Sequence, residues 1–205
     1  VLLLDKDLRA GNWRGVKISH PIHRLANQVL GIVGLGRIGR EVAARARGFG
    51  YTVLGYDPYI DEKTANASGI KLTDFPILLS TADVLTLHLP LNSETRGLIN
   101  AGVIEQMKPS AIVINTCRGA IVDTKALAEA LQTGRIAGAA LDVFETEPLP
   151  PDHPILTAPN TILQPHIAWY SEESLIELQR NAAEEVARIL RGEPPKNPVT
   201  RIQGK

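Results

Sequence analysis

Residues 29–40 read Val-Leu-Gly-Ile-Val-Gly-Leu-Gly-Arg-Ile-Gly-Arg, and this stretch decides the fold. A short apolar run leads into Gly34, Gly36 and Gly39 in G-x-G-x-x-G spacing, and residues 41–49 continue with helical periodicity. This order predicts a buried parallel strand, a tight turn and the start of a helix. The first glycine permits the turn, the second lets the backbone approach a pyrophosphate, and the third lets helix and strand pack closely.

A carboxylate follows the next predicted strand. Residues 51–56 form that strand and end at Asp57, about 18 residues past Gly39. A carboxylate there can accept hydrogen bonds from both hydroxyls of an adenosine ribose and repels a 2′-phosphate, which indicates NAD rather than NADP. The phosphates would lie on the unpaired N–H groups at the start of the preceding helix. The alternative is an ordinary glycine-rich turn, with an aspartate that only caps the next segment.

Composition narrows the class of protein. The 205 residues are 44% hydrophobic, which suits one core and one α/β domain. Lysine plus arginine equals aspartate plus glutamate at 22 each, so no net field attracts nucleic acid or anionic membranes. No run approaches the roughly 18 to 20 apolar residues of a membrane span. The only cysteine, Cys117, predicts no disulfide framework and a reducing, cytoplasmic compartment.

Apolar runs alternate with helical patterns along the chain. The expected strands are residues 29–33, 51–56, 71–72, 83–89, 111–116, 136–143 and 161–164. Helices between parallel strands imply an α/β fold, with a doubly wound parallel sheet of the Rossmann type and right-handed crossovers. Residues 15–27 are expected to be an irregular connection, and residues 92–100 a polar loop with a short helix. His20 and His23 are separated by Pro21 and have no further ligand nearby, so no metal site is predicted.

Four polar residues fall just past predicted strands, where ligands bind in such sheets. They are Arg118, Asp142, Glu147 and His166. Histidine has the side-chain pKa nearest neutrality and can exchange a proton with a carbonyl or hydroxyl oxygen, while a carboxylate on its other nitrogen fixes the tautomer. Arginine can hold a substrate carboxylate with two hydrogen bonds. Separately, each residue could be an ordinary charged loop residue.

The order of several motifs adds a specific resemblance. The motifs are Gly34-Leu35-Gly36-Arg37-Ile38-Gly39, His88-Leu89-Pro90-Leu91, Asn115-Thr116-Cys117-Arg118-Gly119, Val122-Asp123, Ala140-Leu141-Asp142-Val143-Phe144 and Pro165-His166. In this order they resemble the D-isomer-specific 2-hydroxyacid dehydrogenases over nearly the whole chain. The resemblance implies an NAD-dependent oxidoreductase that transfers hydride between NADH and a 2-keto acid or D-2-hydroxy acid.

The resemblance also implies roles for single residues. His166 would be the acid/base, Glu147 its partner, and Arg118 the group that binds the substrate carboxylate. Asp142 would hold the nicotinamide carboxamide. The cofactor site would comprise Gly34, Gly36, Arg37, Ile38, Gly39, Asp57, His88, Pro90, Thr116, Cys117, Arg118, Asp142 and His166. Thr116 and Cys117 would lie along the nicotinamide through their backbone, and no role as a nucleophile is expected for Cys117.

The residues after His166 suggest a branch of this family. Trp169-Tyr170-Ser171-Glu172 resembles the C-terminal-binding-protein branch, in which the tryptophan lies beside the substrate, so Trp169 would shape a pocket for an apolar 2-keto acid. The alternative is a plain packing role. Animal members of that branch are NAD-sensing corepressors, which keeps a regulatory binding protein with little turnover as the alternative function. A dehydrogenase for formate or phosphoglycerate ranks lower, because tryptophan is a poor neighbour for a phosphate.

The resemblance implies a division of the chain. Residues 1–27 would end an interdomain helix and connect it to an NAD-binding domain at 28–170, while residues 171–205 would form a long helix and tail that return to a substrate domain. The chain starts with Val1 inside an apolar run, so we expect a fragment that lacks the N-terminal substrate domain. Such a fragment would bind NAD and turn over substrate poorly. A homodimer through the cofactor domain is also expected, with no direct contact to nucleic acid or membrane.

Overall fold

The computed structural model describes residues 2–19 and 21–198, which fall into two compact units. The first unit is Val1–Leu163 and the second is Gln164–Lys205. Val1 and His20 lie outside the described residues. Among the described residues, no helix combines the length and the apolar character that crossing a bilayer requires.

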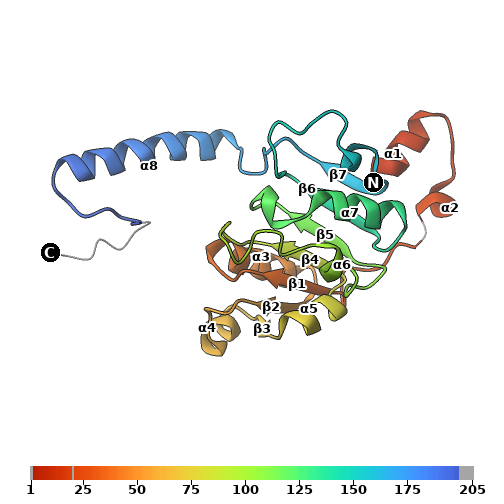
Figure 1. Ribbon diagram of the computed structural model, residues 1–205, viewed down its shortest axis with the longest axis horizontal. Helices are drawn as coiled ribbons and strands as arrows, with labels where there is room; N and C mark the ends of the chain where they lie inside the picture. Colours follow the sequence, from red (N-terminus) through yellow and green to blue (C-terminus); the bar gives the residue numbers. More distant parts are fainter. Residues whose placement is uncertain (1, 20, 199–205) are drawn as a thin grey trace. The chain divides into compact units, whose positions relative to one another are not determined.

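The first unit is built on a parallel sheet (Figure 1). Its seven strands are β1 Val29–Val33, β2 Thr52–Tyr56, β3 Lys71–Leu72, β4 Val84–Leu87, β5 Ile112–Asn115, β6 Gly138–Leu141 and β7 Thr161–Leu163. They lie in the order β3-β2-β1-β4-β5-β6-β7, and every neighbouring pair is parallel. The expected doubly wound α/β fold is therefore confirmed. The chain reverses its direction of travel across the sheet between β1 and β4, the point where such folds bind ligands.

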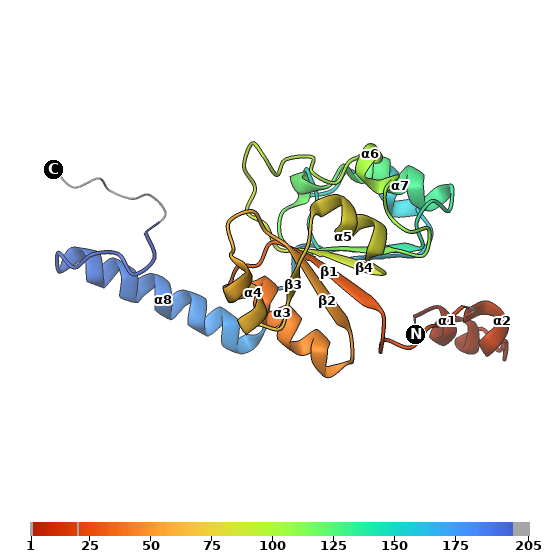
Figure 2. The ribbon, with the colours of Figure 1, turned by 90° about the horizontal axis from the view of Figure 1, so that it is seen from below.

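Helices cover both faces of the sheet. The covering helices are α3 Arg37–Gly48, α4 Glu62–Ala67, α5 Phe75–Thr81, α6 Ala101–Ile104 and α7 Thr124–Gln132, with 3-10 turns at Gly119–Ile121 and Pro154–Thr157. The short helices α1 Leu2–Arg9 and α2 Gly15–Ser19 precede the first strand and pack on each other. Figure 2 shows α3 and α4 on one face, and α5, α6 and α7 on the other. Two core clusters correspond to these faces, because the side chains of a strand alternate between them.

β1 illustrates this packing. Leu30 and Ile32 belong to the cluster that contains Ala43 and Ala46 of α3. Gly31 faces α5 instead, and a Cβ added to it would lie 2.9 Å from the Cβ of Ala82. Burial on both faces explains why the strand reads as a continuous apolar run in the sequence.

Two local expectations were wrong. Residues 15–27 are not wholly irregular, because Gly15–Ser19 forms the short helix α2. No proline or other helix breaker interrupts this stretch before Pro21. Residues 92–100 contain no helix, because the side chain of Asn92 accepts hydrogen bonds from the N–H groups of Glu94 and Thr95 and holds a turn instead.

The second unit contains the helix α8, Glu172–Leu190. Ser171 and Ser174 form a reciprocal capping box at its start: the Ser171 hydroxyl accepts from the N–H of Ser174, and the N–H of Ser171 donates to the hydroxyl of Ser174. Acidic Glu172 and Glu173 in the first turn complement the helix dipole.

Replacement of Gly39 tests the tight contact at the start of α3. Gly39 is buried, and a Cβ at this position would collide with the carbonyl oxygen of Gly34. We expect Gly39→Ala to lower the free energy of unfolding by about 2 kcal/mol or more, since forced overpacking typically costs about 1–3 kcal/mol. Urea denaturation measures it. Gly48→Ala is the matched control on the same helix, because nothing lies within 4 Å of its added Cβ. Equal stability of the two variants would contradict this account.

Candidate functional site

The carboxyl ends of five strands gather most of the predicted site residues. Gly34, Gly36, Arg37, Ile38 and Gly39 follow β1, Asp57 follows β2, His88 and Pro90 follow β4, Thr116, Cys117 and Arg118 follow β5, and Asp142 follows β6, with Glu147 in the loop beyond it. Parallel strands bring their carboxyl ends to one edge of the sheet, so these residues share that edge.

The glycine turn has the geometry that a dinucleotide requires. Gly34 has φ of +93°, and an added Cβ would lie 2.5 Å from the carbonyl oxygen of His88 at the end of β4. Gly36 is exposed, with nothing within 4 Å of its Cβ position. It is also the N-cap of α3, and no side chain caps the helix there. The start of α3 therefore presents backbone N–H groups, including those of Arg37 and Ile38, which suits a phosphate.

Asp57 is fixed against this turn. Its Oδ2 accepts a hydrogen bond from the N–H of Leu35 at 2.8 Å, and its Oδ1 accepts one from the N–H of Tyr59 at 2.9 Å. The first bond joins the end of β2 to the glycine turn, and the second folds the residues after β2 back onto the carboxylate. The negative charge is therefore held beside the turn, in the place that suits ribose hydroxyls.

His88 contributes a neutral lining at the end of β4. Burial lowers the pKa of this imidazole, so the ring is uncharged at neutral pH. The ring Nε2 lies 3.1 Å from the hydroxyl oxygen of Thr86. The backbone N–H of His88 donates to the carbonyl oxygen of Val33 at 2.8 Å. The backbone of His88 is thereby tied to β1, next to the glycine turn.

Asn115 organises the loop that carries Arg118, a role that was not predicted from the sequence. Its buried side chain donates to the carbonyl oxygen of Arg118 at 3.0 Å and accepts from the N–H of Cys117 at 3.1 Å. The guanidinium of Arg118 is exposed, and its Nη1 donates to the carbonyl oxygen of Cys117 at 2.6 Å. A polar residue at the end of an apolar strand was the available signal in the sequence.

Cys117 is not built as a nucleophile. Burial raises the pKa of its thiol, so the thiolate is scarce at neutral pH. The sulfur also contacts Oδ1 of Asn115 at 3.1 Å. The expected position of the Cys117 backbone along the nicotinamide stays a prediction.

The loops after β5 and β6 are packed together. Gly119 lies so close to Phe144 that an added Cβ would collide with the Phe144 backbone. Asp142 is 4% exposed, and its N–H donates to the carbonyl oxygen of Asn115 at 3.0 Å. Oε1 of Glu147 accepts from the N–H of Phe144 at 2.9 Å. The geometry thus brings Asp142 and Glu147 into the loop that packs against the Arg118 loop.

A second group of polar residues in this region was also missed. Glu145 accepts hydrogen bonds from the N–H of Thr124 at 2.7 Å and from its hydroxyl at 2.6 Å. Nε2 of His153 lies 3.3 Å from the same hydroxyl, while its Nδ1 accepts from the N–H of Ile155. This cluster caps the start of α7 and fixes the loop that follows β6. The sequence offers no spacing rule that separates Glu145 from Glu147.

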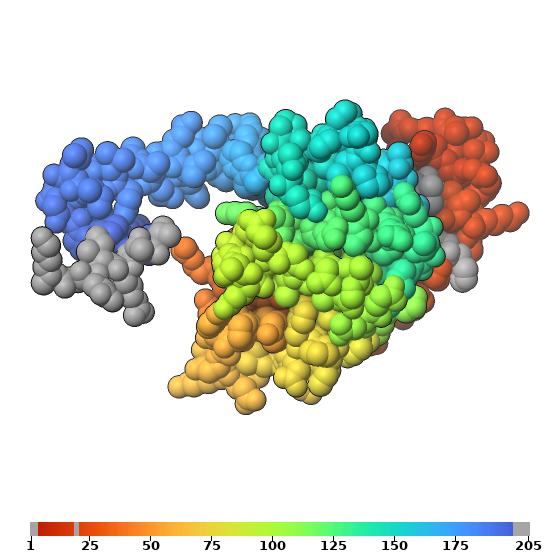
Figure 3. All heavy atoms as spheres, viewed as in Figure 1, coloured from red at the N-terminus to blue at the C-terminus, as the bar shows by residue number. Residues whose placement is uncertain are grey.

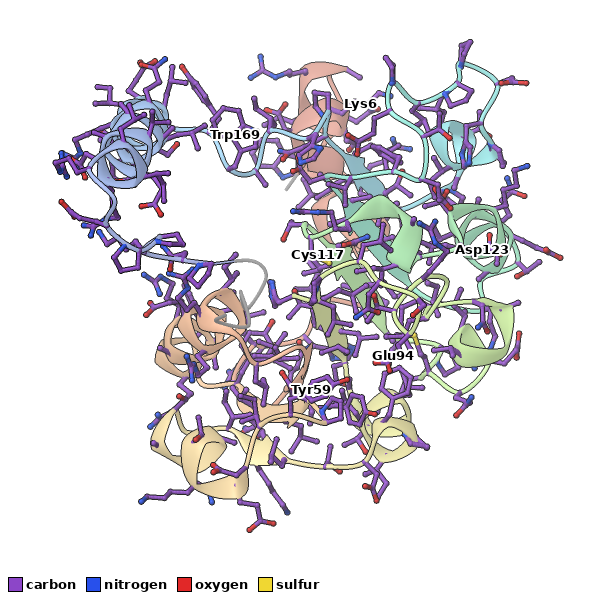
Figure 4. The ribbon with its side chains drawn as sticks, turned by 60° about the vertical axis from the view of Figure 1, so that its left-hand side comes forward. Lys6, Tyr59, Glu94, Cys117, Asp123 and Trp169 are labelled. Carbon is purple, nitrogen blue, oxygen red and sulfur yellow. The ribbon has the colours of Figure 1, made fainter. Side chains whose placement is uncertain are left out.

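His166 and Trp169 belong to the second unit. His166 has φ of +56°, an uncommon conformation for a residue other than glycine. The indole N–H of Trp169 donates to the carbonyl oxygen of His166 at 2.9 Å, and the ring of Trp169 meets that of Tyr170 edge-to-face, with centroids 5.7 Å apart. The short segment before α8 is therefore held in a defined conformation. Figure 4 labels Trp169 there, and Cys117 in the first unit.

The described residues contain no group of three or more histidine, cysteine, aspartate or glutamate side chains that could hold a metal ion.

Known proteins are similar to this chain in sequence. The sequence model of the family described as "D-isomer specific 2-hydroxyacid dehydrogenase, NAD binding domain" matches residues 1–168. The chain is 41% identical over 195 residues to a D-3-phosphoglycerate dehydrogenase of Archaeoglobus fulgidus, covering 95% of this chain and 37% of that protein. It is 43% identical over 204 residues to a glyoxylate reductase of Korarchaeum cryptofilum, covering 97% of this chain and 60% of that protein.

A solved structure agrees with these relatives. The NAD-complexed D-isomer specific 2-hydroxyacid dehydrogenase of Lactobacillus delbrueckii ssp. bulgaricus superposes with a TM-score of 0.77 at 31% identity, covering 87% of this chain and 58% of that one. The chain therefore belongs to the D-isomer-specific 2-hydroxyacid dehydrogenases, and its fold is their NAD-binding domain. It spans 37% and 60% of the lengths of the two curated relatives. None of these three proteins is named for the C-terminal-binding-protein branch, so that finer resemblance stays a prediction.

Replacement of Gly36 tests the glycine turn as a cofactor site. The position is open to solvent, so a methyl group there costs little in folding but intrudes where the pyrophosphate must approach. We expect Gly36→Ala to weaken NADH binding about tenfold, or about 1.4 kcal/mol, with an unchanged thermal midpoint. Fluorescence titration of NADH measures the dissociation constant, and Gly48→Ala again serves as the control. Unaltered NADH affinity in Gly36→Ala would place the cofactor elsewhere.

Proposed function

We propose that this chain is the cofactor domain of an NAD-dependent dehydrogenase that interconverts 2-keto acids and D-2-hydroxy acids. In this proposal residues 28–170 bind the dinucleotide, and residues 171–205 form a helix and tail that return to a substrate domain. The observation that carries it is the fixed carboxyl edge of the sheet, where the open Gly36 and the anchored Asp57 occupy one part and the Asn115-ordered Arg118 loop another.

The chain's own residues have the chemistry that this reaction requires. NADH, when bound, supplies the hydride. Arg118 orients the keto acid, because a guanidinium can form two parallel hydrogen bonds to a carboxylate. We assign the acid/base role to His166 and the role of its orienting carboxylate to Glu147, because a histidine can give a proton to a developing alkoxide near neutral pH. Asp142, buried at the end of β6, is assigned to the nicotinamide carboxamide.

The substrate class rests on the relatives. The names of the two curated relatives are those of enzymes acting on phosphoglycerate and on glyoxylate, which supports an acid with an oxygen function at carbon 2. We assign Trp169 to the substrate pocket, where an indole favours an apolar side chain over a phosphate. Since these relatives carry the names of enzymes, the comparisons do not favour the NAD-sensing alternative.

Histidine replacement tests the proposed reaction. With full-length protein, NADH oxidation is followed against 2-keto acids with small, branched, thioether, aromatic and phosphorylated side chains. We expect turnover on at least one of them, and we expect His166→Ala to lower kcat by about 10²–10⁴, the usual contribution of a general acid/base. NADH affinity should stay nearly unchanged. Tight NADH binding without turnover on any acid would favour the sensor, and an equal loss of NADH affinity would make His166 structural.

We further propose that the protein is cytoplasmic and forms a homodimer through this domain. The single cysteine supports a reducing compartment. Self-association is supported by apolar side chains of the N-terminal segment, which belongs to the same compact unit as the sheet: Trp13 is 90% exposed, and Val16 and Ile22 are exposed nearby. Figure 3 shows this segment in red, at the right-hand side of the view. It also lines a cleft of about 1350 Å³ at the amino edge of the sheet, together with Ile112 and Ile136.

Sedimentation velocity tests the dimer. We expect the protein to sediment as a dimer and Trp13→Ser to raise the dissociation constant about tenfold or more, because aromatic anchors dominate interface energies. Ile77→Ser, which removes an exposed apolar side chain from the outer side of α5, serves as the control and should leave the dimer intact. A monomer at all concentrations would refute this proposal.

A further inference from the structure

The loops after β2 and β4 are joined by one side-chain hydrogen bond. The hydroxyl of Tyr59 donates to Oε2 of Glu94 at 3.0 Å. Tyr59 follows β2 and Glu94 follows β4, and these strands are not neighbours, because β1 lies between them. With about 4.8 Å between neighbouring strands, the bond bridges strands that are about 10 Å apart. It therefore crosses beyond the end of β1, where the glycine turn begins.

Both ends of the bridge are anchored. The N–H of Tyr59 donates to Oδ1 of Asp57, the carboxylate that also accepts from Leu35 of the glycine turn. Glu94 lies in a turn that the side chain of Asn92 holds, and the hydroxyl of Thr95 fastens this turn to the carbonyl oxygen of Pro90 at 2.7 Å. Figure 4 labels Tyr59 and Glu94, whose side chains meet from the two loops. The position of the Glu94 carboxylate is thus set by the fold.

Two carboxylates converge on this place. Both carboxylates hydrogen-bond to Tyr59, Asp57 at the backbone N–H and Glu94 at the hydroxyl. The hydrogen bond to Glu94 and the negative charges of Glu94 and Asp57 accordingly raise the pKa of Tyr59. Tyr59 and Glu94 are both exposed, so the bridge itself adds little to folding stability. The bridge is joined to Asp57, the residue proposed to bind the adenosine ribose, so it can act on the bound nucleotide instead.

We propose that Glu94, held in place by Tyr59, is a second determinant that rejects a 2′-phosphate and so selects NAD(H) over NADP(H). This inference rests on the proposed dinucleotide site and adds a residue to it. In this proposal Asp57 approaches the ribose from the loop after β2. Glu94 approaches it from the loop after β4, on the other side of β1. A dianionic phosphate on the ribose would therefore meet negative charge from both sides, while an unphosphorylated ribose would not.

Two adenosine nucleotides that differ only in the 2′-phosphate test this inference. The probes are 5′-AMP and adenosine 2′,5′-bisphosphate, and the readout is the inhibition constant of each for displacement of NADH fluorescence. In Glu94→Gln we expect the ratio of the bisphosphate constant to the AMP constant to fall about fivefold, which corresponds to about 1 kcal/mol. The AMP constant itself should change less than about twofold, since AMP carries no group that Glu94 repels. Tyr59→Phe should lower the ratio less, because the charge remains and only its tether is lost.

Three comparisons separate charge from structure. The effect of Glu94→Gln should shrink between about 0.05 and 0.5 M salt, because screening weakens a charge interaction but not a packing effect. The double variant Tyr59→Phe/Glu94→Gln should match Glu94→Gln, because the tether matters only while the carboxylate is present. Glu129→Gln, an exposed charge on α7, removes the same charge elsewhere and should leave the ratio unchanged.

Each other result would overturn the inference. An unchanged ratio in Glu94→Gln would show that the carboxylate plays no part in selection. An equal rise in the inhibition constants of both nucleotides would show that the bridge only maintains the structure of the site. Absence of NADH binding by the unaltered protein would overturn the proposed function itself, and that result is distinct from NADH binding with an unchanged ratio.

Discussion

The contact on which the site depends is between backbones, at the point where the sheet reverses its strand order. Gly34 lies against the carbonyl oxygen of His88, and Gly39 lies against the carbonyl oxygen of Gly34, with no room for a Cβ at either position. A side chain here would push β1 away from β4 or from α3. The glycine turn therefore stays in contact with the end of β4 and with the first turn of α3. The start of α3 faces the open space beside Gly36.

Hydrogen bonds to side chains convert the remaining strand ends into fixed loops. Asp57 ties the end of β2 to the glycine turn, and Asn115 ties together the residues that lead to Arg118. Between these anchors the lining is uncharged, because burial keeps His88 neutral and the Cys117 thiol protonated. Negative charge is thus fixed after β2 and positive charge after β5. This distribution of charge suits a dinucleotide whose ribose hydroxyls lie near the negative charge, with an anionic substrate near the positive charge.

The fold could be predicted from the sequence because each determinant was local. The central strands β1, β4, β5 and β6 are largely buried, apolar runs, and the glycine spacing places the turn directly after β1. The positions of Asp57 and Arg118 followed from the rule that ligands bind at the carboxyl ends of parallel strands. Glu145 and the Tyr59–Glu94 bridge were missed because their partners lie 21 and 35 positions away in the sequence. Asn115 was missed for a different reason: its contacts with Cys117 and Arg118 are local, but they depend on the conformation of an irregular loop. No periodicity reports a hydrogen bond between residues 35 positions apart.

The two compact units separate two kinds of chemistry. The glycine turn, Asp57 and the Arg118 loop all lie in the first unit, whereas the proposed acid/base His166 lies in the second. Dinucleotide binding is therefore encoded mainly by the sheet, while proton transfer is assigned to a residue outside it. A protein of this family could bind the dinucleotide without transferring a proton, since the residues that form the dinucleotide site of the first unit do not include His166. For this reason the fold and the cofactor site alone are common to an enzyme and a sensor, and the chemistry of His166 distinguishes them.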